Sequence, residues 1–374
     1  MYDIIMHQMI DADILKLDSF ERGAATEMDK QNYFSWLSSQ TVSEWTNDSG
    51  ILSQNRAAIS KGAVGCTTNP PLSYEALVTD SQIYSEDLEN INKNLSEYEF
   101  GMEAIGLVAK RLSNEYLPMY KDTGKFGRVS VQVCPDLCDD PEGTFNAAKT
   151  ISGWGENIMV KIPVTQAGIW ALEELAAIGV PTNPTVTTSI SQIIAAAEAY
   201  ERGVARAKAA GTTPARSCLA FVFGRIQDYL TILNTERSVG LAASDLEWAS
   251  VALLKRCLKI FKENNYNSIL QPAAFRAALH VEQISGSPVC STIHPKIQKM
   301  VEEADEEGKM RREILFEEPV DQTIIDRVSR AFPEFVSAYE PGAVSEKDFI
   351  TFGPTVMTLD TFAQGWKNII SLKA

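Results

Sequence analysis

Short apolar runs alternate with longer amphipathic segments through most of the chain. From about Val42, eight runs rich in β-branched and small apolar residues predict strands, and the stretches between them have the periodicity of helices. The predicted strands cover residues 41–45, 63–68, 128–133, 157–162, 180–186, 218–223, 268–273 and 288–293. Strand alternating with helix in this way is typical of a parallel sheet with crossover helices.

The number of strand–helix units favours a closed barrel. Predicted helices include residues 81–114, 168–177, 189–209, 245–264 and 273–284. Eight units predict an α/β fold of the (β/α)8 TIM-barrel type, whose active site lies at the carboxyl ends of the strands. An open doubly wound sheet would give a similar pattern. No G-x-G-x-x-G follows a strand and no GKS or GKT is present, which disfavours a nucleotide-binding sheet.

Helical patterns flank the barrel on both sides. We expect an N-terminal helical extension over residues 1–40, a barrel catalytic domain over 41–296 and a C-terminal helical extension over 297–374. The chain is strongly charged after Lys296 and its pattern is helical. The acidic run Glu302–Glu307 within it is typical of a solvated helix face rather than of a binding site.

The charge of the chain narrows its partners. A formal net charge of −15 disfavours nucleic acid and anionic membranes as partners, because both are bound through a surplus of Lys and Arg. A small anionic substrate stays compatible, since one or two local arginines can bind it. No run of 18 apolar residues predicts a membrane span, and Asp3, Asp11 and Asp13 stand where a secretory signal is positively charged. We expect a cytoplasmic protein.

Cysteine and histidine give no sign of a metal or a cofactor. The six cysteines are scattered without a CxxC pair, so reduced thiols are expected. The three histidines form neither an HxH nor an HExxH pattern. We therefore expect no catalytic metal and no cofactor.

One lysine in a predicted strand is a candidate nucleophile. Side chains alternate across a strand, so Lys161 points opposite to Val160 and Ile162 and would face the barrel interior. Burial lowers the pKa of a lysine, and the neutral amine is the form that attacks carbonyl groups. From this strand alone, a lysine that extends from a strand end to solvent explains the pattern equally well.

Polar residues at neighbouring strand ends favour the catalytic interpretation. Asn183 and Thr185 lie on one face of the next strand, and residues 67–70 (TTNP) end the second strand in a similar way. In the third strand, Ser130 and Gln132 alternate with valines. A barrel interior normally favours Val, Ile and Leu, so this concentration of polar groups predicts a site.

Two arginines suggest an anion-binding site. Arg225 follows the sixth predicted strand and Arg276 follows the seventh, near the position where barrel enzymes commonly bind phosphate. The alternative is that either arginine pairs with a structural carboxylate, such as Asp228 for Arg225.

These residues, in this order, resemble the transaldolase family of Schiff-base (class I) aldolases. The resemblance runs from about Trp45 to Pro295, and its most specific part is K-I-P-x-T, a helix and then G-V-x-x-N-x-T. The segments that carry it are TNDSGI (46–51), GCTTNPPL (65–72), VSVQV (129–133), the block 157–189, FVFGRIQDY (221–229) and AAFR (273–276).

The resemblance implies a role for each candidate residue. Lys161 would form a Schiff base with a ketose, and cleavage of the C3–C4 bond would leave a dihydroxyacetone unit for transfer to an aldehyde acceptor, as in the pentose phosphate pathway. Asp48 would be the acid/base group, with Asn47 as a rival. Thr67, Asn69, Asn183 and Thr185 would position the substrate, and Arg225 and Arg276 would bind its phosphate.

The chain departs from the family pattern at three positions. Gln132 stands where transaldolases have a glutamate, as in the related fructose-6-phosphate aldolases, which release free dihydroxyacetone; simple aldol cleavage is therefore an alternative activity. Ala220 and Ala274 replace serines near the two arginines, which leaves open whether the sugar carries a phosphate. A non-catalytic barrel that binds sugar phosphates is a third alternative. The helical extensions are compatible with a homodimer.

Overall fold

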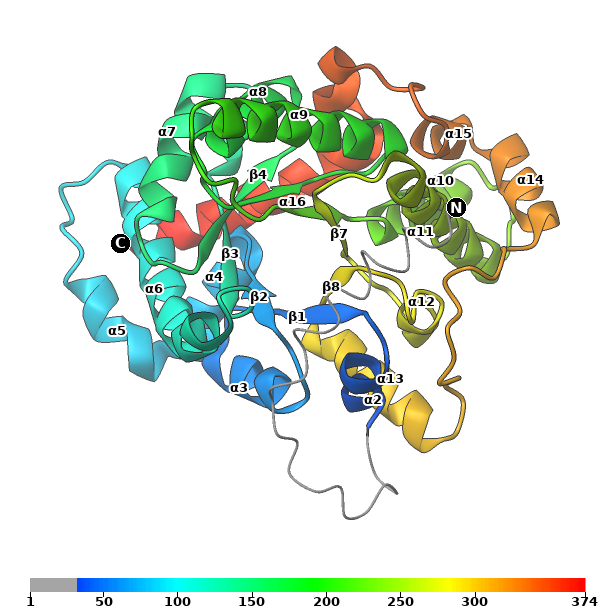
Figure 1. The fold of residues 1–374 in the computed structure, drawn as a ribbon, viewed down its shortest axis with the longest axis horizontal. Helices are drawn as coiled ribbons and strands as arrows, with labels where there is room; N and C mark the ends of the chain where they lie inside the picture. Colours follow the sequence, from blue (N-terminus) through cyan, green and yellow to red (C-terminus); the bar gives the residue numbers. More distant parts are fainter. Residues whose placement is uncertain (1–31, 374) are drawn as a thin grey trace. The chain divides into compact units, whose positions relative to one another are not determined.

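Eight parallel strands form the centre of the fold in a computed structural model that describes residues 32–373 (Figure 1). They are β1 (Glu44–Asp48), β2 (Gly65–Thr67), β3 (Arg128–Gln132), β4 (Ile158–Pro163), β5 (Thr182–Thr185), β6 (Cys218–Phe221), β7 (Ile269–Pro272) and β8 (Cys290–Ile293). Six form one sheet in the order β5-β4-β3-β2-β1-β8, and β6 pairs with β7. Parallel bridges join β5 and the turn after it to the β6 region, and β7 lies against β8. The strands thus follow the circular order of a (β/α)8 barrel.

Helices follow the strands and cover the outside of the barrel (Figure 1). The helices are α2 (Tyr33–Gln40), α3 (Leu52–Ser60), α4 (Pro70–Thr79), α5 (Ser81–Glu89), α6 (Glu97–Thr123), α7 (Pro141–Ser152), α8 (Gln166–Ala177), α9 (Ile190–Ala209), α10 (Gly224–Glu236), α11 (Ala243–Asn264), α12 (Ala278–Glu282), α13 (Pro295–Glu306), α14 (Gln322–Ala331), α15 (Pro333–Tyr339) and α16 (Gly353–Ile370). Short 3₁₀ turns occupy η1 (Pro135–Leu137), η2 (Glu346–Thr351) and η3 (Ser371–Lys373).

All eight predicted strands are present, and the first begins three residues later than expected, at Glu44. Thr41 directly follows α2, and its hydroxyl donates a hydrogen bond to the carbonyl of Leu37 in that helix. Val42 is 60% exposed and does not enter the core. This shift makes Asp48 the last residue of β1.

Two helix predictions differ from the structure. The segment predicted over 81–114 divides into α5 and α6, because Ser96 and Glu99 form a capping box that starts a new helix. The segment predicted from residue 273 becomes helical only at Ala278, since Ala274 has φ +64°, outside the right-handed helical region.

The segments predicted as extensions are described in part. Residues 1–31 of the expected N-terminal extension lie outside the described residues, and α2 follows them. After Lys296, α13 ends at Glu306 and the chain is irregular until Gln322. The acidic run lies on the outer side of α13, where Glu302 pairs with Lys61 at 2.6 Å and Asp305 pairs with Arg312 at 2.8 Å. The division at residue 296 stays a prediction.

The barrel core has the alternation that the strand pattern predicted. Val129, Val131, Val160 and Ile162 are buried in the apolar cluster between the strands and the surrounding helices. The residues between them point into the barrel, so the polar side chains of β3 and β4 face its interior. All six cysteines are free thiols, as expected.

The last long helix, α16, packs against the carboxyl-terminal end of the barrel. Near its start, Thr355 lies 2.8 Å from the hydroxyl of Thr188, which follows β5. Near its end, a Cβ on Gly365 would lie 2.4 Å from Pro71, which follows β2, so only glycine permits this approach. In Figure 1, α16 (red) passes behind the strands, so the view is onto their amino-terminal ends.

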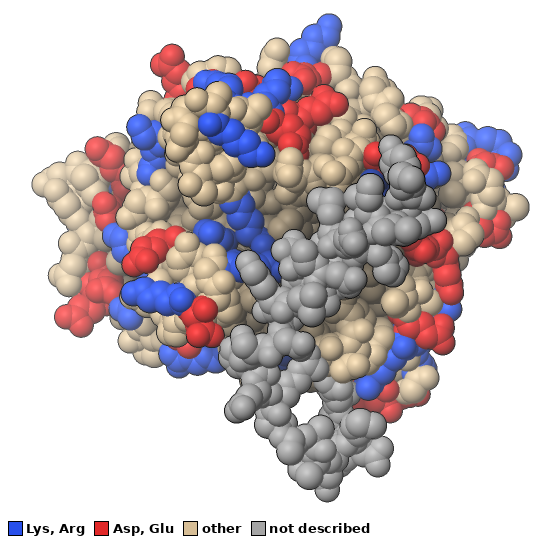
Figure 2. Space-filling view, viewed as in Figure 1, with Lys and Arg blue, Asp and Glu red and all other residues tan. Residues whose placement is uncertain are grey.

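Figure 2 shows acidic and basic side chains interspersed over this same face, with Lys and Arg atoms also gathered near its centre. A chain with a net charge of −15 thus has a local group of basic side chains on this face. Among residues 32–373, every helix is too short or too polar to span a lipid bilayer.

Candidate active site

Lys161 lies inside the barrel, in the middle of β4, and is only 4% exposed. Its ammonium nitrogen donates a hydrogen bond to the carbonyl of Thr68 at 3.3 Å. Burial lowers the pKa of Lys161 below its ordinary value of 10.5; the charge of Asp48 opposes this shift and that of Arg225 adds to it. A buried amine with a lowered pKa is more often neutral, and the neutral amine is the nucleophilic form.

The neighbouring strands place one amide side chain on each side of this lysine. Gln132 on β3 and Asn183 on β5 are both aligned with Lys161 in the sheet register. Both are buried, at 2% and 0% exposure. The amide nitrogen of Asn183 donates to the side-chain oxygen of Gln271 on β7 at 2.6 Å, which fixes the orientation of its amide group.

Several polar atoms around Lys161 are buried without a hydrogen-bond partner. Both amide atoms of Gln132, the side-chain oxygen of Asn183 and the hydroxyl of Thr185 are in this condition. Each such group typically costs about 1–3 kcal/mol unless a ligand or water satisfies it. Three of the predicted site residues therefore present unused hydrogen-bonding atoms on the two strands beside the lysine.

Asp48 ends β1 on the inward face. One carboxylate oxygen accepts a hydrogen bond from the hydroxyl of Thr67 on β2 at 2.6 Å, and the same hydroxyl lies 2.6 Å from that of Thr292 on β8. Asn47, the rival acid/base position, points outward, where its side-chain oxygen accepts a hydrogen bond from Gln298 on α13 at 2.7 Å. Asp48 and not Asn47 is thus on the lysine side of the strand.

The two predicted arginines meet around one carboxylate. Arg276 donates to both oxygens of Asp228, at 2.7 and 2.5 Å, whereas Arg225 approaches Asp228 only to 3.8 Å. The loops that carry them come very close, because a Cβ on Gly224 would lie 1.8 Å from the carbonyl oxygen of Ala274. Burial lowers the pKa of Arg225, and the charge of Arg276 lowers it further, whereas Asp228 and Asp48 oppose this.

The donors of Arg276 are largely used within the protein. Its Nη1 donates to the carbonyls of Ala274 and Phe275 at 2.9 and 3.1 Å, in addition to the pair of bonds with Asp228. A guanidinium has five N–H donors, so four are occupied. Arg225 has fewer bonds of this kind and is the freer of the two for an anion.

Asn69, a predicted substrate-binding residue, is also the first capping residue of a helix. Its side-chain oxygen accepts a hydrogen bond from the backbone N–H of Leu72 at 3.0 Å, and it is the N-cap of α4. Pro70 follows it at the first helical position, which is the usual start of a helix. The capping bond uses the side-chain oxygen of Asn69, and its amide nitrogen takes no part in that bond.

Three residues in contact with the predicted site did not stand out from the sequence. Thr292 and Gln271 lie on strands that were predicted, and their inward alternation was the available signal. His280 follows Arg276 by four residues, and its Nδ1 accepts a hydrogen bond from the backbone N–H of Arg276 at 3.2 Å. Burial lowers the pKa of His280 to about 3, with a further contribution from Arg276.

An α/β barrel with a buried lysine among uncharged polar groups is typical of enzymes that react covalently with carbonyl compounds through an amine. A family model described as Transaldolase/Fructose-6-phosphate aldolase matches residues 46–334, which is most of the chain. The chain belongs to this family, as its motifs suggested, and is an enzyme of the transaldolase type.

Curated relatives agree with this assignment. Transaldolase 1 of Streptomyces coelicolor is 24% identical over 345 residues, which cover 83% of this chain and 90% of the relative. Transaldolase 1 of Streptomyces avermitilis is 33% identical over 47% of this chain and 48% of the relative. The transaldolase of Neisseria gonorrhoeae is 30% identical over 58% of this chain and 61% of the relative. The chain thus spans about half to three fifths of the latter two proteins.

Proposed function

We propose that this enzyme transfers a dihydroxyacetone unit from a ketose phosphate to an aldose acceptor through a Schiff base on Lys161. The observation that carries the proposal is the burial of Lys161 between Gln132 and Asn183, with unpartnered polar atoms beside it. Family membership implies sugar phosphates as the substrate class.

In this mechanism the neutral amine of Lys161 attacks C2 of the ketose, and loss of water leaves a protonated imine. Asp48 accepts the proton of the C4 hydroxyl, the C3–C4 bond breaks, and its electron pair moves into the imine to form an enamine. The shortened aldehyde leaves. Attack of the enamine on an acceptor aldehyde, with return of the proton from Asp48, forms the new bond, and water then releases the product.

Asp48 is suited to this proton transfer by its position. It reaches the interior from β1, and its charge acts on Lys161, so both face the same space. Thr67 donates to its carboxylate and holds its orientation. In this proposal Asn183 and Thr185 bind substrate hydroxyls through the oxygens that have no partner among the described residues.

The substrate phosphate is assigned to Arg225, with Arg276 in support. Arg225 is at the amino terminus of α10, where backbone N–H groups also favour an anion. Asp228 neutralises part of the charge of the pair. We infer that this end of the site binds a phosphate less tightly than two unpaired arginines would.

Gln132 supports a second candidate activity, aldol cleavage with release of free dihydroxyacetone. A glutamine can hold a water molecule but cannot donate and recover a proton as a carboxylic acid can. Both of its amide atoms are buried without a partner, which suits a bound water. Transfer and release share Lys161 and Asp48 and differ in the fate of the enamine.

One experiment tests the shared step and then separates the activities. The enzyme is incubated with fructose 6-phosphate or other ketoses and reduced with borohydride, and the adduct is located by mass spectrometry. We expect it on Lys161, and none on the Lys161→Met variant. If none of the ketoses gave an adduct, the result would favour a barrel that binds sugar phosphates without reacting with them. Adding an aldehyde acceptor then distinguishes transfer from release of dihydroxyacetone.

Two further properties belong to the proposal. We infer a cytoplasmic location from the sequence, and a homodimer from the helices outside the barrel. Light scattering coupled to size-exclusion chromatography measures the second property, and an elution mass of about 41 kDa would contradict it.

A further inference from the structure

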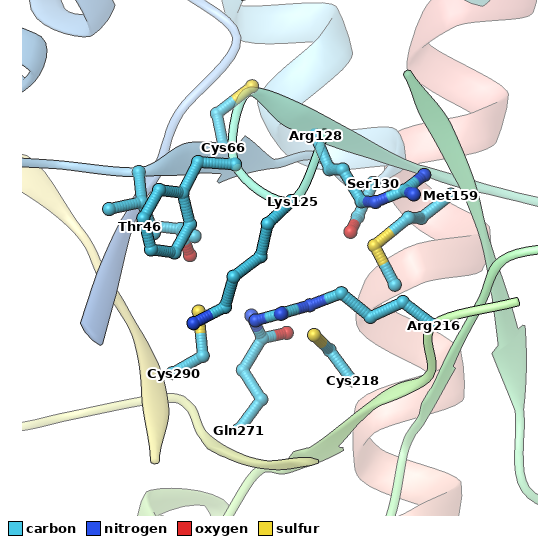
Figure 3. Close-up of a pocket in the computed structure, with 12 residues that line it drawn as sticks. Thr46, Cys66, Lys125, Arg128, Ser130, Met159, Arg216, Cys218, Gln271 and Cys290 are labelled. Atoms are coloured by element: carbon cyan, nitrogen blue, oxygen red, sulfur yellow. The ribbon is translucent and has the colours of Figure 1, made fainter. Parts of the chain in front are cut away.

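The end of the barrel opposite to α16 contains a pocket with several cations (Figure 3). Its non-atom space is about 300 Å³, part of it open to solvent. The cations are Lys125, from the loop before β3, Arg128, the first residue of β3, and Arg216, which precedes β6. These positions are at the amino-terminal ends of β3 and β6.

The pocket is separate from the lysine site. Gln271 lines it and also accepts the hydrogen bond of Asn183, so this side chain stands between the two ends of the barrel interior. Ser130 lines the pocket, whereas Gln132, two residues along the same strand, is aligned with Lys161.

One carboxylate pairs with two of these three cations. Glu44 accepts from Lys125 at 2.5 Å and from Arg216 at 2.8 Å. Among the described residues Arg128 has no carboxylate partner; it lies over the ring of Tyr120 at 4.8 Å. In Figure 3 the tips of Lys125 and Arg216 come together near Gln271 and Cys290, and Arg128 lies on the side of Ser130 and Met159.

The guanidinium of Arg128 carries unsatisfied donors. Its Nε and Nη1 are buried and have no hydrogen-bond partner. Burial lowers the pKa of Arg128, Tyr120 opposes this, and the charge of Arg216 lowers it again. Buried donors on a charged group beside a second cation are costly unless an anion satisfies them.

The neighbouring thiols do not remove the excess positive charge. Contact with Cys290 and the charge of Arg216, working against burial, lower the pKa of Cys218 to about 6. Even with Cys218 as a thiolate and Glu44 ionised, the three cations outnumber the two anions.

We propose that this pocket is a second anion site, which binds a phosphate group between Arg128 and the Lys125–Arg216 pair. A phosphate oxygen would accept a charge-assisted hydrogen bond from one of the unused donors of Arg128, Nε or Nη1. Glu44 competes with the ligand for Lys125 and Arg216. The ligand is either inorganic phosphate or the phosphate of a small phosphomonoester, because part of the pocket is open to solvent and could admit the rest of an ester.

The test measures binding of radiolabelled inorganic phosphate by equilibrium dialysis, at ionic strength held constant with chloride. The full-length Arg225→Gln, Arg276→Gln enzyme removes the predicted phosphate site at the other end. We expect it to retain one bound phosphate per chain. No binding by this variant, at phosphate concentrations that saturate the parent enzyme, would overturn the proposal. Competition with glycerol phosphate distinguishes a preference for the ester from a preference for the free ion.

Three further substitutions in that background locate the bound phosphate. Arg128→Met should weaken it by about tenfold or more, the loss expected for a charge-assisted pair. Arg202→Gln is the matched control, since Arg202 pairs with Glu173 on the outside of α9 and should not matter. Glu44→Gln should strengthen binding several-fold, because Lys125 and Arg216 lose their competitor.

The two substitutions are expected to change phosphate affinity in opposite directions, so misfolding cannot explain both results. Damage to the fold could explain weaker binding by Arg128→Met, but it could not explain tighter binding by Glu44→Gln. Unchanged or weaker binding by Glu44→Gln, or unchanged binding by Arg128→Met, would place the phosphate elsewhere. These outcomes do not depend on Lys161 chemistry, so the inference and the proposed function can fail separately.

Discussion

Arg276 binds the carboxylate of Asp228 through Nε and Nη2, at 2.7 and 2.5 Å, and thereby holds a negative charge next to Arg225. This arrangement leaves a pair of arginines with the net charge of one. A substrate phosphate would have to share these groups with the carboxylate.

Replacing Asp228 by Asn should raise the preference for phosphorylated over unphosphorylated ketoses several-fold, since the competing charge is removed. The measurement is the ratio of kcat/KM for fructose 6-phosphate to that for fructose. Asp326→Asn, on the exposed side of α14, serves as the control. A lower ratio would mean that Asp228 positions Arg276 for the phosphate instead of competing with it.

Replacing Asp48 by Asn should separate adduct formation from turnover. The charge of Asp48 raises the pKa of Lys161, so its removal lets that pKa fall further below 10.5. The rate of borohydride-trapped adduct formation should therefore reach half of its maximum at a lower pH, while turnover decreases. A shift to higher pH would contradict the assignment, and the exposed Asp136→Asn should leave the profile unchanged.

Replacing Lys161 by Met should abolish the adduct and stabilise the fold by about 1–3 kcal/mol, because a buried amine is exchanged for an apolar chain of similar length. Urea denaturation measures the change in the free energy of unfolding. Lys208→Met on the exposed side of α9 controls for general effects of methionine. If Lys161→Met were less stable than the parent, the amine would contribute more to the fold than its burial costs.

Replacing Gln132 by Glu should increase transfer relative to release of dihydroxyacetone, since a carboxylic acid can donate and recover a proton. The two products are measured together, with and without an aldehyde acceptor. Gln271→Glu is an informative comparison, because Gln271 is also a buried interior glutamine but bonds to Asn183. An unchanged ratio in Gln132→Glu would exclude this residue as the determinant.

His280 should make the protein sensitive to mild acid. Its folded pKa is about 3 and its ordinary value is 6.5, so below pH 6.5 the unfolded chain takes up a proton that the folded chain excludes. The free energy of unfolding should fall by about 1.4 kcal/mol for each pH unit below 6.5 from this group. Urea denaturation at several pH values between 6.5 and 5, before most carboxylates titrate, measures this effect. In His280→Gln the free energy of unfolding should decrease less steeply over this range, whereas in His294→Gln it should decrease as in the parent enzyme.

The local pattern was sufficient to predict much of the fold. Alternation in β4 placed Lys161 inside the barrel, because Val160 and Ile162 had to face the helices. The division between α5 and α6 is also encoded locally, in the S-x-x-E of Ser96 and Glu99, which is typical of a helix start. These features depend on neighbours in the sequence, which is why the sequence alone can reveal them.

The partners of the polar groups depended on contacts between distant segments. Asp228 was considered as a partner of Arg225, three residues away, yet it bonds chiefly to Arg276, which is 48 residues away. The left-handed backbone at Ala274 precedes that bond, and nothing in an alanine signals it. The N-cap position of Asn69 is a local feature that the following proline signals, and its predicted contact with the substrate stays a prediction.

The position of α16 has a consequence for how the enzyme is made. Ribosomes build the chain from its amino terminus, and Gly353–Ile370 is the last long helix to be synthesised. All eight strands, with Lys161 among them, exist before the segment that lies across their carboxyl ends. A chain interrupted after α15 would contain every proposed catalytic residue but would lack the helix that packs against the carboxyl-terminal end of the barrel. Synthesis of α16 is therefore the last step in forming the surroundings of the site.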